Sequence, residues 1–129
     1  MKEELFKKWV SILGLEKWRI FPNLDAVPEE FCDSGELRAG EAQYDVVNRT
    51  AKILILRQEA FAVPEEYNFE RTLVHELLHL VFAPFYPNTN DCLETVVHMT
   101  LDDLARAFVD AKAFGAEDKS DSDESNPEC

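Results

Sequence analysis

The fold of this chain is decided by the stretch Arg71-Thr72-Leu73-Val74-His75-Glu76-Leu77-Leu78-His79-Leu80-Val81-Phe82. It contains the pattern H-E-x-x-H, with His75 and His79 four residues apart. On an α-helix this spacing puts both imidazoles on one face, where they can bind one tetrahedral metal ion. Glu76 lies roughly 60° round the helix from His79, so it is better placed to reach a water on the ion than to bind the ion itself. Two of the three histidines of the chain belong to this pattern, which therefore predicts a zinc site.

The apolar residues of the same stretch predict that its helix is buried at the centre of the fold. They surround the helix on nearly all sides: Leu73, Val74, Leu77, Leu78, Leu80, Val81 and Phe82. Two histidines and a glutamate inside such a helix need partners for their polar atoms. A zinc ion would supply that partner. The alternative, that His75 and His79 are ordinary helix residues, leaves these atoms without one.

Length and charge indicate one domain that does not bind nucleic acid. The 129 residues are enough for one core but not for two. We expect this domain to span 1–115, and we expect the acidic segment 116–129, which has almost no apolar residues, to be disordered. A net charge of −13 argues against nucleic acid as the main partner, and no apolar run approaches the roughly 20 residues of a membrane span.

The cysteines indicate a reducing compartment. Cys32, Cys92 and Cys129 are odd in number and dispersed, and no two of them have the spacing of a zinc-binding C-x-x-C pair. The N-terminus is acidic and then amphipathic, unlike a secretory signal. We therefore expect a cytoplasmic, monomeric protein with free thiols and no membrane partner.

The pattern of the remaining chain predicts an α+β fold. We expect a small antiparallel or mixed sheet of about three strands, packed on the H-E-x-x-H helix and on a following helix that carries a glutamate, with a further helix at the N-terminus. The expected elements are a helix over about 2–13 that ends at Gly14, a strand over 17–21 closed by Pro22-Asn23, a helical turn at 28–31, a hairpin with arms 41–47 and 50–56, a helix that begins after the cap Asn68 and ends before Pro84, and a helix over about 91–114 that ends at Gly115. Within the hairpin, 51–56 is rich in β-branched and large apolar residues and is the better candidate for the central strand.

A catalytic zinc usually has three protein ligands and one open position, so a third ligand is needed. The extended pattern H-E-x-x-H-x-x-G-x-x-H is excluded, because Phe82 and Phe85 stand where glycine and histidine would be required. The final helix offers Asp91, Glu94, His98, Asp102 and Asp103. We choose Glu94 because, at about 100° per residue, it falls inside the apolar stripe that contains Leu101 and Ala105, where a carboxylate is unfavourable unless it is paired or binds metal. Its alternative role is a favourable charge at the helix N-terminus.

His98 follows Glu94 by one turn and points toward the same side of the helix. It could be a further ligand, a partner of a ligand, or a hydrogen-bond donor to the oxyanion of a reaction, and a packing role is the alternative. Asp102, one more turn along, is a weaker candidate for orienting a ligating imidazole.

With H-E-L-L-H on one helix and Glu94 on the next, the chain resembles the gluzincin zinc metallopeptidases, and its size makes it similar to their minimal single-domain forms, the minigluzincins. It also resembles small metallopeptidase domains of phage and mobile-element origin that cleave repressors. The similarity covers roughly residues 40–110. It implies zinc held by His75, His79 and Glu94, and an edge strand that aligns an extended peptide beside the metal. His98 departs from the family, which often has an aspartate four residues after its glutamate.

The function predicted from these residues is a zinc-dependent endopeptidase that acts on a protein or peptide substrate. Zinc held by neutral imidazoles and one carboxylate lowers the pKa of a bound water and polarises the substrate carbonyl. Glu76 acts as the general base that takes the proton of this zinc-bound water and returns it to the leaving amine. His98, Tyr67 and Tyr86 are candidates for donating to the oxyanion.

The main alternative is a non-catalytic interaction or regulatory protein, phage- or mobile-element-encoded, in which zinc is a structural brace. A site closed by four ligands, with His98 among them, would favour it, whereas Glu76 has no use in such a site. A two-metal phosphoesterase is disfavoured, because the chain lacks the extra carboxylate cluster. The acidic segment 116–129 either only adds solubility or folds over the cleft and holds the enzyme latent.

Overall fold

The computed structural model of the chain describes residues 1–31, 39–85 and 91–124, with side chains described for 1–31, 39–84 and 96–113. These residues form three α-helices, three strands and four short 3-10 turns. In chain order they are α1 (Lys2–Ile12), β1 (Arg19–Ala26), η1 (Pro28–Glu30), β2 (Gly40–Asp45), β3 (Thr50–Leu56), η2 (Gln58–Ala60), η3 (Pro64–Glu66), α2 (Phe69–Phe82), η4 (Ala83–Phe85) and α3 (Asp91–Glu124). The α+β class predicted from the sequence is confirmed.

The strands form a mixed sheet in the order β1-β3-β2. The central strand β3 pairs in parallel with β1 and antiparallel with β2, which confirms the prediction that 51–56 lies in the middle. Alternate side chains of β3 enter two clusters, because successive residues of a strand point to opposite faces of the sheet. Ile53 and Ile55 join the main core under the helices, whereas Leu54 and Leu56 pack with Ala26 and Phe31. A strand covered on both faces accounts for the continuous apolar run in the sequence.

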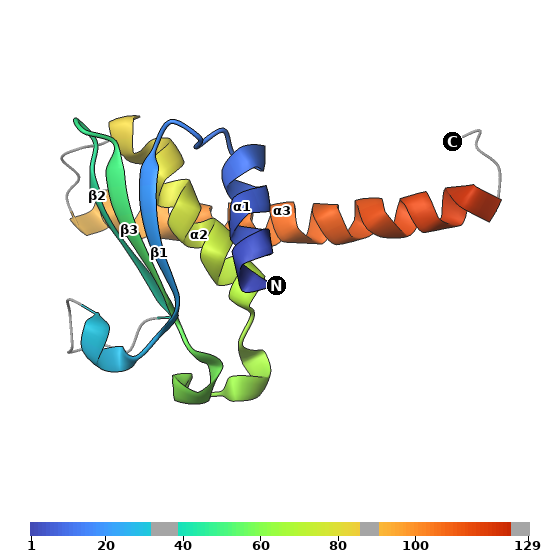
Figure 1. The fold of residues 1–129 in the computed structure, drawn as a ribbon, viewed down its shortest axis with the longest axis horizontal. Helices are drawn as coiled ribbons and strands as arrows, with labels where there is room; N and C mark the ends of the chain where they lie inside the picture. The colour runs from blue at the N-terminus through green and yellow to red at the C-terminus, as the bar shows by residue number, and fades with distance from the viewer. Residues whose placement is uncertain (32–38, 86–90, 125–129) are drawn as a thin grey trace.

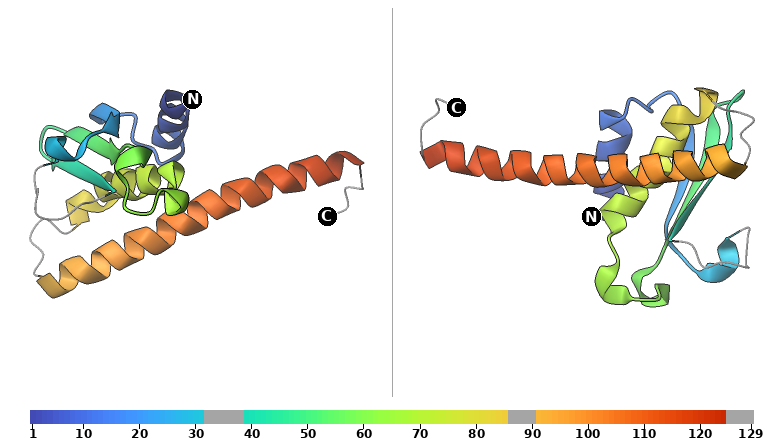
Figure 2. Two further views of the ribbon diagram at one scale, coloured as in Figure 1. Left: turned by 90° about the horizontal axis from the view of Figure 1, so that it is seen from below. Right: turned by 180° about the vertical axis from the view of Figure 1, so that it is seen from behind.

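Helix α2 lies between the sheet and the other two helices (Figures 1 and 2). Five of its apolar residues are buried as predicted, namely Leu73, Val74, Leu77, Leu78 and Leu80, whereas the predicted Val81 and Phe82 are only partly buried. Asn68 caps the helix by accepting a hydrogen bond from the backbone N–H of Arg71 at 3.0 Å. The helix ends at Phe82, before Pro84, again as predicted. The H-E-x-x-H pattern therefore lies at the centre of the fold, on a helix whose start and end are set by local sequence.

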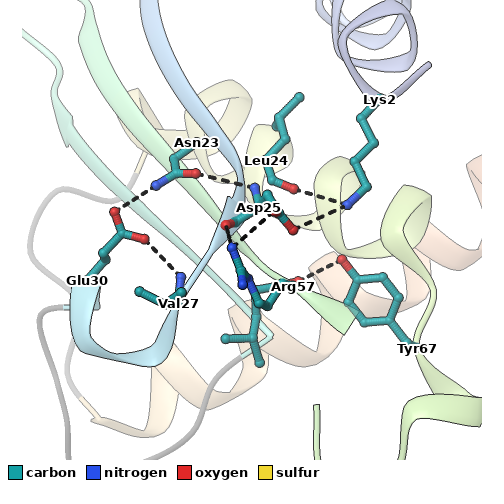
Figure 3. A network of polar contacts seen from close by, with 9 residues as sticks. Lys2, Asn23, Leu24, Asp25, Val27, Glu30, Arg57 and Tyr67 are labelled. Carbon is teal, nitrogen blue, oxygen red and sulfur yellow. Dashed lines mark hydrogen bonds and ion pairs between the residues drawn. The ribbon is translucent and has the colours of Figure 1, made fainter. Parts of the chain in front are cut away.

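Polar contacts join the start of α1 to the ends of β1 and β3 (Figure 3). Lys2 Nζ donates to the carbonyl of Leu24 at 3.4 Å and lies 3.9 Å from Asp25 Oδ1. Arg57, just after β3, places Nη2 3.2 Å from Asp25 Oδ2. Because these side chains are partly exposed, the ion pairs add little stability, about 0–1 kcal/mol each.

Strand β1 is longer than the sequence predicted. The expected strand over 17–21 was to close at Pro22-Asn23, but the observed strand continues to Ala26. The prediction was wrong because β1 is an edge strand that pairs only with β3 among the described residues. At an edge, the missing N–H of Pro22 removes no essential ladder bond. The irregularity appears later, as a register shift between Asn23 and Ala26.

Helix α3 continues through Gly115 to Glu124, so the predicted helix end at Gly115 was wrong. The expected domain boundary at 115 and the expected disorder of 116–129 stay predictions, and residues 125–129 lie outside the described range. One glycine disfavours a helix by only about 1 kcal/mol relative to alanine, and neighbours such as Ala113 and Ala116 favour it. The 34-residue helix is roughly 50 Å long and projects past the rest of the molecule (Figure 1). None of the helices in the described ranges has an apolar stretch long enough to cross a membrane.

Candidate metal centre

Three imidazoles meet where α3 crosses α2. His75 and His79 come from α2 and His98 from α3, and each offers a ring nitrogen within 4.8 Å of those of the other two. The ring centroids are 5.0 Å apart for His75 and His79, and 4.8 Å apart for His79 and His98. In a tetrahedral zinc site with Zn–N bonds of about 2.0–2.1 Å, the nitrogens would lie about 3.3 Å apart. A small closure of the three partly buried rings would therefore bring them to the separations that a zinc ion requires.

The structure places His98 beside the predicted pair of histidines, so that it could serve as the third ligand, the role expected of Glu94. Glu94 belongs to α3 one turn before His98, but its side chain lies outside the described residues, so its role as a ligand stays a prediction. The apolar stripe predicted on this helix is confirmed, since Leu101 and Ala105 are buried. The side chain of Asp91 falls outside the described part as well, and Asp103 is exposed.

Asp102 contacts the imidazole of His75. Its Oδ1 lies 2.7 Å from Nδ1 of His75, which is a hydrogen-bonding distance. The ring N–H does not point directly at the oxygen, so the contact is close but not well aligned. Since the Asp102 side chain is exposed, a small rotation would align it. A carboxylate on Nδ1 leaves Nε2 of His75 for the metal, which is the usual arrangement behind a ligating histidine.

The environment of His75 favours the neutral ring that metal binding requires. Burial is the largest influence and lowers the pKa of this imidazole below its ordinary 6.5, and the nearby His98 lowers it further. The carboxylate of Asp102 acts in the opposite direction, but it does not overcome the effect of burial. At neutral pH, His75 therefore presents a lone pair without first losing a proton.

Glu76 is buried against the edge of the sheet. The residue is 6% exposed, and it lines the same cleft as the three histidines. The close approach depends on Gly40, the first residue of β2. A Cβ at Gly40 would lie 2.9 Å from Cγ and Oε2 of Glu76 and 2.9 Å from Cγ2 of Thr72. Real side chains essentially never tolerate such contacts, so glycine is what allows β2 to pass this close to α2.

The cleft has a volume of about 830 Å³ and is bordered by β2 on one side and α3 on the other. Its lining residues are Ala39, Gly40, Glu41, Ala42 and Tyr44 beside the sheet, Arg71, Thr72, His75, Glu76 and His79 from α2, and His98, Met99, Asp102, Ala105 and Arg106 from α3. Within the part of the chain that the structure describes, β2 pairs only with β3, so its outer edge faces the cleft. An extended chain could therefore pair with β2 next to the histidines.

The three residues proposed as donors to an oxyanion have different positions. His98 lies in the cleft, and Tyr86 lies outside the described residues. Tyr67 lies elsewhere: its hydroxyl donates to the carbonyl of Leu56 at 2.6 Å, and burial, followed by the charges of Asp25 and Glu59, raises its pKa. Tyr67 does not line the cleft, so its proposed role was wrong.

Among the cleft residues that the sequence did not mark as site candidates are a glycine and two arginines. The sequence marks Gly40 only as a break in the chain and gives no signal for its contact with Glu76. Arg71 could have been found, because it precedes His75 by four residues and therefore shares its helix face. Arg106 is not part of any sequence motif, and only the packing of α3 on α2 brings it to the cleft.

No protein-family model matches this chain, and comparisons with curated proteins and with solved structures found no match either.

Proposed function

We propose that the chain is a zinc-dependent endopeptidase built on the H-E-x-x-H pair of α2, with His98 or the Glu94 of the gluzincin pattern as third ligand. The observation that supports this most directly is the convergence of His75, His79 and His98 next to the buried carboxylate of Glu76, in a cleft bordered by strand β2. Neutral imidazoles are the nitrogen ligands that zinc prefers, and three of them leave one position of a tetrahedron open. When bound there, zinc would polarise a substrate carbonyl and lower the pKa of water.

The residues of the chain would divide the remaining work. Glu76 would take a proton from the attacking water and deliver it to the leaving amine. Its position in the same cleft as the three histidines favours this role. Asp102 would hold the ring of His75, and the outer edge of β2 would hold the substrate backbone in an extended conformation. The substrate would be a protein or peptide, cleaved by a cytoplasmic monomer.

The first experiment is the zinc content of untagged protein, measured by mass spectrometry for the parent and for His98→Ala and Glu94→Ala. About one zinc per chain is expected in the parent. Loss of zinc in His98→Ala alone indicates a three-histidine site with an open position. Loss of zinc in Glu94→Ala alone indicates the ligand set expected from the sequence, His75, His79 and Glu94. A folded parent without zinc would contradict both.

Cleavage of a peptide library by the zinc-loaded parent then tests the reaction, with Glu76→Gln as the matched control. The substituted amide preserves the size of the side chain but cannot accept the proton, so we expect activity to fall by about 10²–10⁴-fold while zinc content stays constant. Equal cleavage by parent and variant would show that the activity does not come from this site.

One observation favours a second candidate, a non-catalytic protein in which zinc braces the fold. The third imidazole lies one turn from Glu94, so the two together could close a four-ligand site. In that case both His98→Ala and Glu94→Ala lose zinc, the Glu76→Gln variant behaves like the parent, and no peptide is cleaved.

A further inference from the structure

Two arginines line the cleft beside the candidate metal centre, Arg71 one helical turn from His75 and Arg106 two turns from His98. Arg71 precedes His75 by four residues on α2, and Arg106 follows Asp102 by four residues on α3. The two helices run in opposite directions here, because His75 contacts Asp102 while Arg71 contacts Asp110. Arg106 lies between these two aspartates along α3, and both arginines line the cleft on the side of His75 that leads toward Asp110. Both residues therefore belong to the same end of the cleft.

The arginines are only loosely engaged by the protein. Arg71 Nη2 lies 3.4 Å from Asp110 Oδ1, and Arg106 Nη1 lies 3.8 Å from Asp103 Oδ1. Both aspartate side chains are exposed, at 61% and 76%, and exposed pairs of this kind contribute about 0–1 kcal/mol. A ligand carboxylate that enters the cleft can replace them, since it would be better shielded from water and could accept two parallel hydrogen bonds.

The acidic residues that line the cleft, Glu41, Glu76 and Asp102, already have partners within the protein. Glu41 accepts a hydrogen bond from Gln43 Nε2 at 2.6 Å, and Glu76 is buried beside Gly40. Asp102 faces His75. The positive charge at the arginine end is unusual in a chain of net charge −13, which on the whole repels acidic ligands.

The direction of β2 indicates which part of a peptide would meet the arginines. β2 begins at Gly40, beside Thr72 and Glu76, and leads to Val46, which lines a second pocket with Leu80. It therefore runs the same way as α2, as Figure 1 also shows. A peptide that pairs antiparallel to β2, the commoner pairing, has its C-terminal end at Gly40 and hence at the arginines.

We propose that Arg71 and Arg106 form a carboxylate-binding subsite, which selects peptides with an acidic side chain or a free C-terminal carboxylate on the C-terminal side of the cleaved bond. A helical turn is about 5.4 Å and an extended peptide advances about 3.3 Å per residue, so the carboxylate belongs within about two or three residues of that bond. The inference rests on the proposed peptidase function for the nature of the ligand.

The test is peptide binding to the zinc-loaded Glu76→Gln chain, which should bind without cleaving. The probes are short fluorescent peptides in matched pairs: glutamate against glutamine at each position, and a free against an amidated C-terminus. We expect about tenfold tighter binding of the carboxylate member of at least one pair, as for other charge-assisted contacts. The pair that responds tells an acidic side chain from a terminal carboxylate. High salt should weaken the preference.

The preference should fall below about twofold when Arg71→Gln and Arg106→Gln are combined in the Glu76→Gln chain. Arg57→Gln is the matched control, because Arg57 has similar exposure to Arg71, 40% against 42%, and a similar aspartate partner, but does not line the cleft. Zinc content and thermal unfolding of each variant show whether it is folded.

Equal binding within every pair, a preference that survives the double substitution, or no binding of any peptide would overturn the subsite. Failure of the proposed function looks different. If the parent cleaves none of these peptides while the arginine-dependent preference in binding remains, the subsite stands and the peptidase does not. If the parent cleaves peptides but shows no preference for a carboxylate, the peptidase function stands and the subsite does not.

Discussion

At the scale of single residues, Asp102 reaches the candidate centre through its contact with His75. The contact of 2.7 Å between their side chains restrains the ring and raises its basicity, in opposition to the effect of burial on the pKa. Asp102 is thus a positioning residue, and its effect should appear in metal affinity.

We expect Asp102→Asn to weaken zinc binding by about 10–100-fold, because the amide carries no charge to stabilise the ligating imidazole. Competition with a chromophoric chelator measures this. Asp103→Asn is the matched control, since the Asp103 side chain is exposed and its Oδ1 lies 3.8 Å from Arg106 Nη1 rather than beside a histidine. An Asp102→Asn protein that binds zinc as tightly as the parent would remove the positioning role.

Gly40 shows how little space separates β2 from α2. We expect Gly40→Ala to destabilise the fold by about 1–3 kcal/mol, because the new methyl group must displace Glu76 and Thr72 or move the strand. Urea unfolding measures the change. Gly14→Ala is the control: it has φ of +70° but nothing within 4 Å of the new Cβ, so only backbone strain of about 1–2 kcal/mol applies. If Gly40→Ala retains parental stability and zinc content, the close contact does not matter.

His75 should make the stability of the metal-free protein depend on pH. Its folded-state pKa lies below the ordinary 6.5, so as pH falls through 6.5 the unfolded chain takes up a proton before the folded chain does. The contribution is intact above 6.5 and is lost progressively as pH falls toward the folded-state pKa. We therefore expect the free energy of unfolding of the parent to fall relative to that of His75→Gln between pH 7.5 and 5.5. Parallel pH profiles would contradict this.

At the scale of elements, Glu70 ties the three helices together. Its Oε2 accepts a hydrogen bond from Trp9 Nε1 of α1 at 2.7 Å and another from Lys112 Nζ of α3. Trp9 is buried, and Lys112 also lies over its ring at 5.9 Å from the centroid. One carboxylate on α2 therefore holds both outer helices.

We expect Glu70→Ala to destabilise the protein by about 1–3 kcal/mol, because it leaves the indole N–H of a buried tryptophan without a partner. Urea unfolding gives the size of the effect, and hydrogen exchange should show α1 losing protection first. Glu66→Ala, at an exposed position of η3, should change stability by less than about 0.5 kcal/mol. A change in Glu70→Ala no larger than in this control would show that the contacts are weak.

At the scale of the whole molecule, the layers create the cleft. Helix α2 packs on the sheet, and α3 packs on α2 (Figure 2). The cleft is therefore lined by β2 on one side, by α3 on the other, and by the H-E-x-x-H helix between them. The projecting end of α3 takes no part in this arrangement. The last α3 residues that pack on the core or reach α2 are Val109 and Lys112, among those whose side chains are described.

We expect deletion of 116–129 to leave the free energy of unfolding within about 0.5 kcal/mol of the parent and the zinc content unchanged. The segment has six acidic residues and one lysine, so the net charge changes from −13 to −8. Unchanged peptide cleavage would mean that the segment only adds charge, whereas a rise in activity would mean that it restrains the enzyme. A loss of more than about 1 kcal/mol would show that it contacts the folded body.

The sequence by itself determined the features that depend on local geometry. H-E-x-x-H places two imidazoles on one face of any helix, Asn68 caps that helix, and Pro84 prevents its continuation. The apolar run of β3 identified the central strand, because a strand buried on both faces has no polar alternation. The failures were also local rules overridden by context: Pro22 lies in an edge strand, and the single Gly115 did not end a long helix.

Only the tertiary structure decided which distant residues complete the centre. The way α3 crosses α2 brings His98 and Asp102 to the histidine pair and Arg106 to the same cleft as Arg71. Helical angles place these side chains on a face, but the docking depth of one helix on another depends on the whole core, which no short stretch of sequence specifies. The same holds for Gly40, whose importance comes from Glu76 and Thr72, more than 30 residues away. Chemistry that depends on one helix could be predicted, and chemistry shared between elements needed the fold.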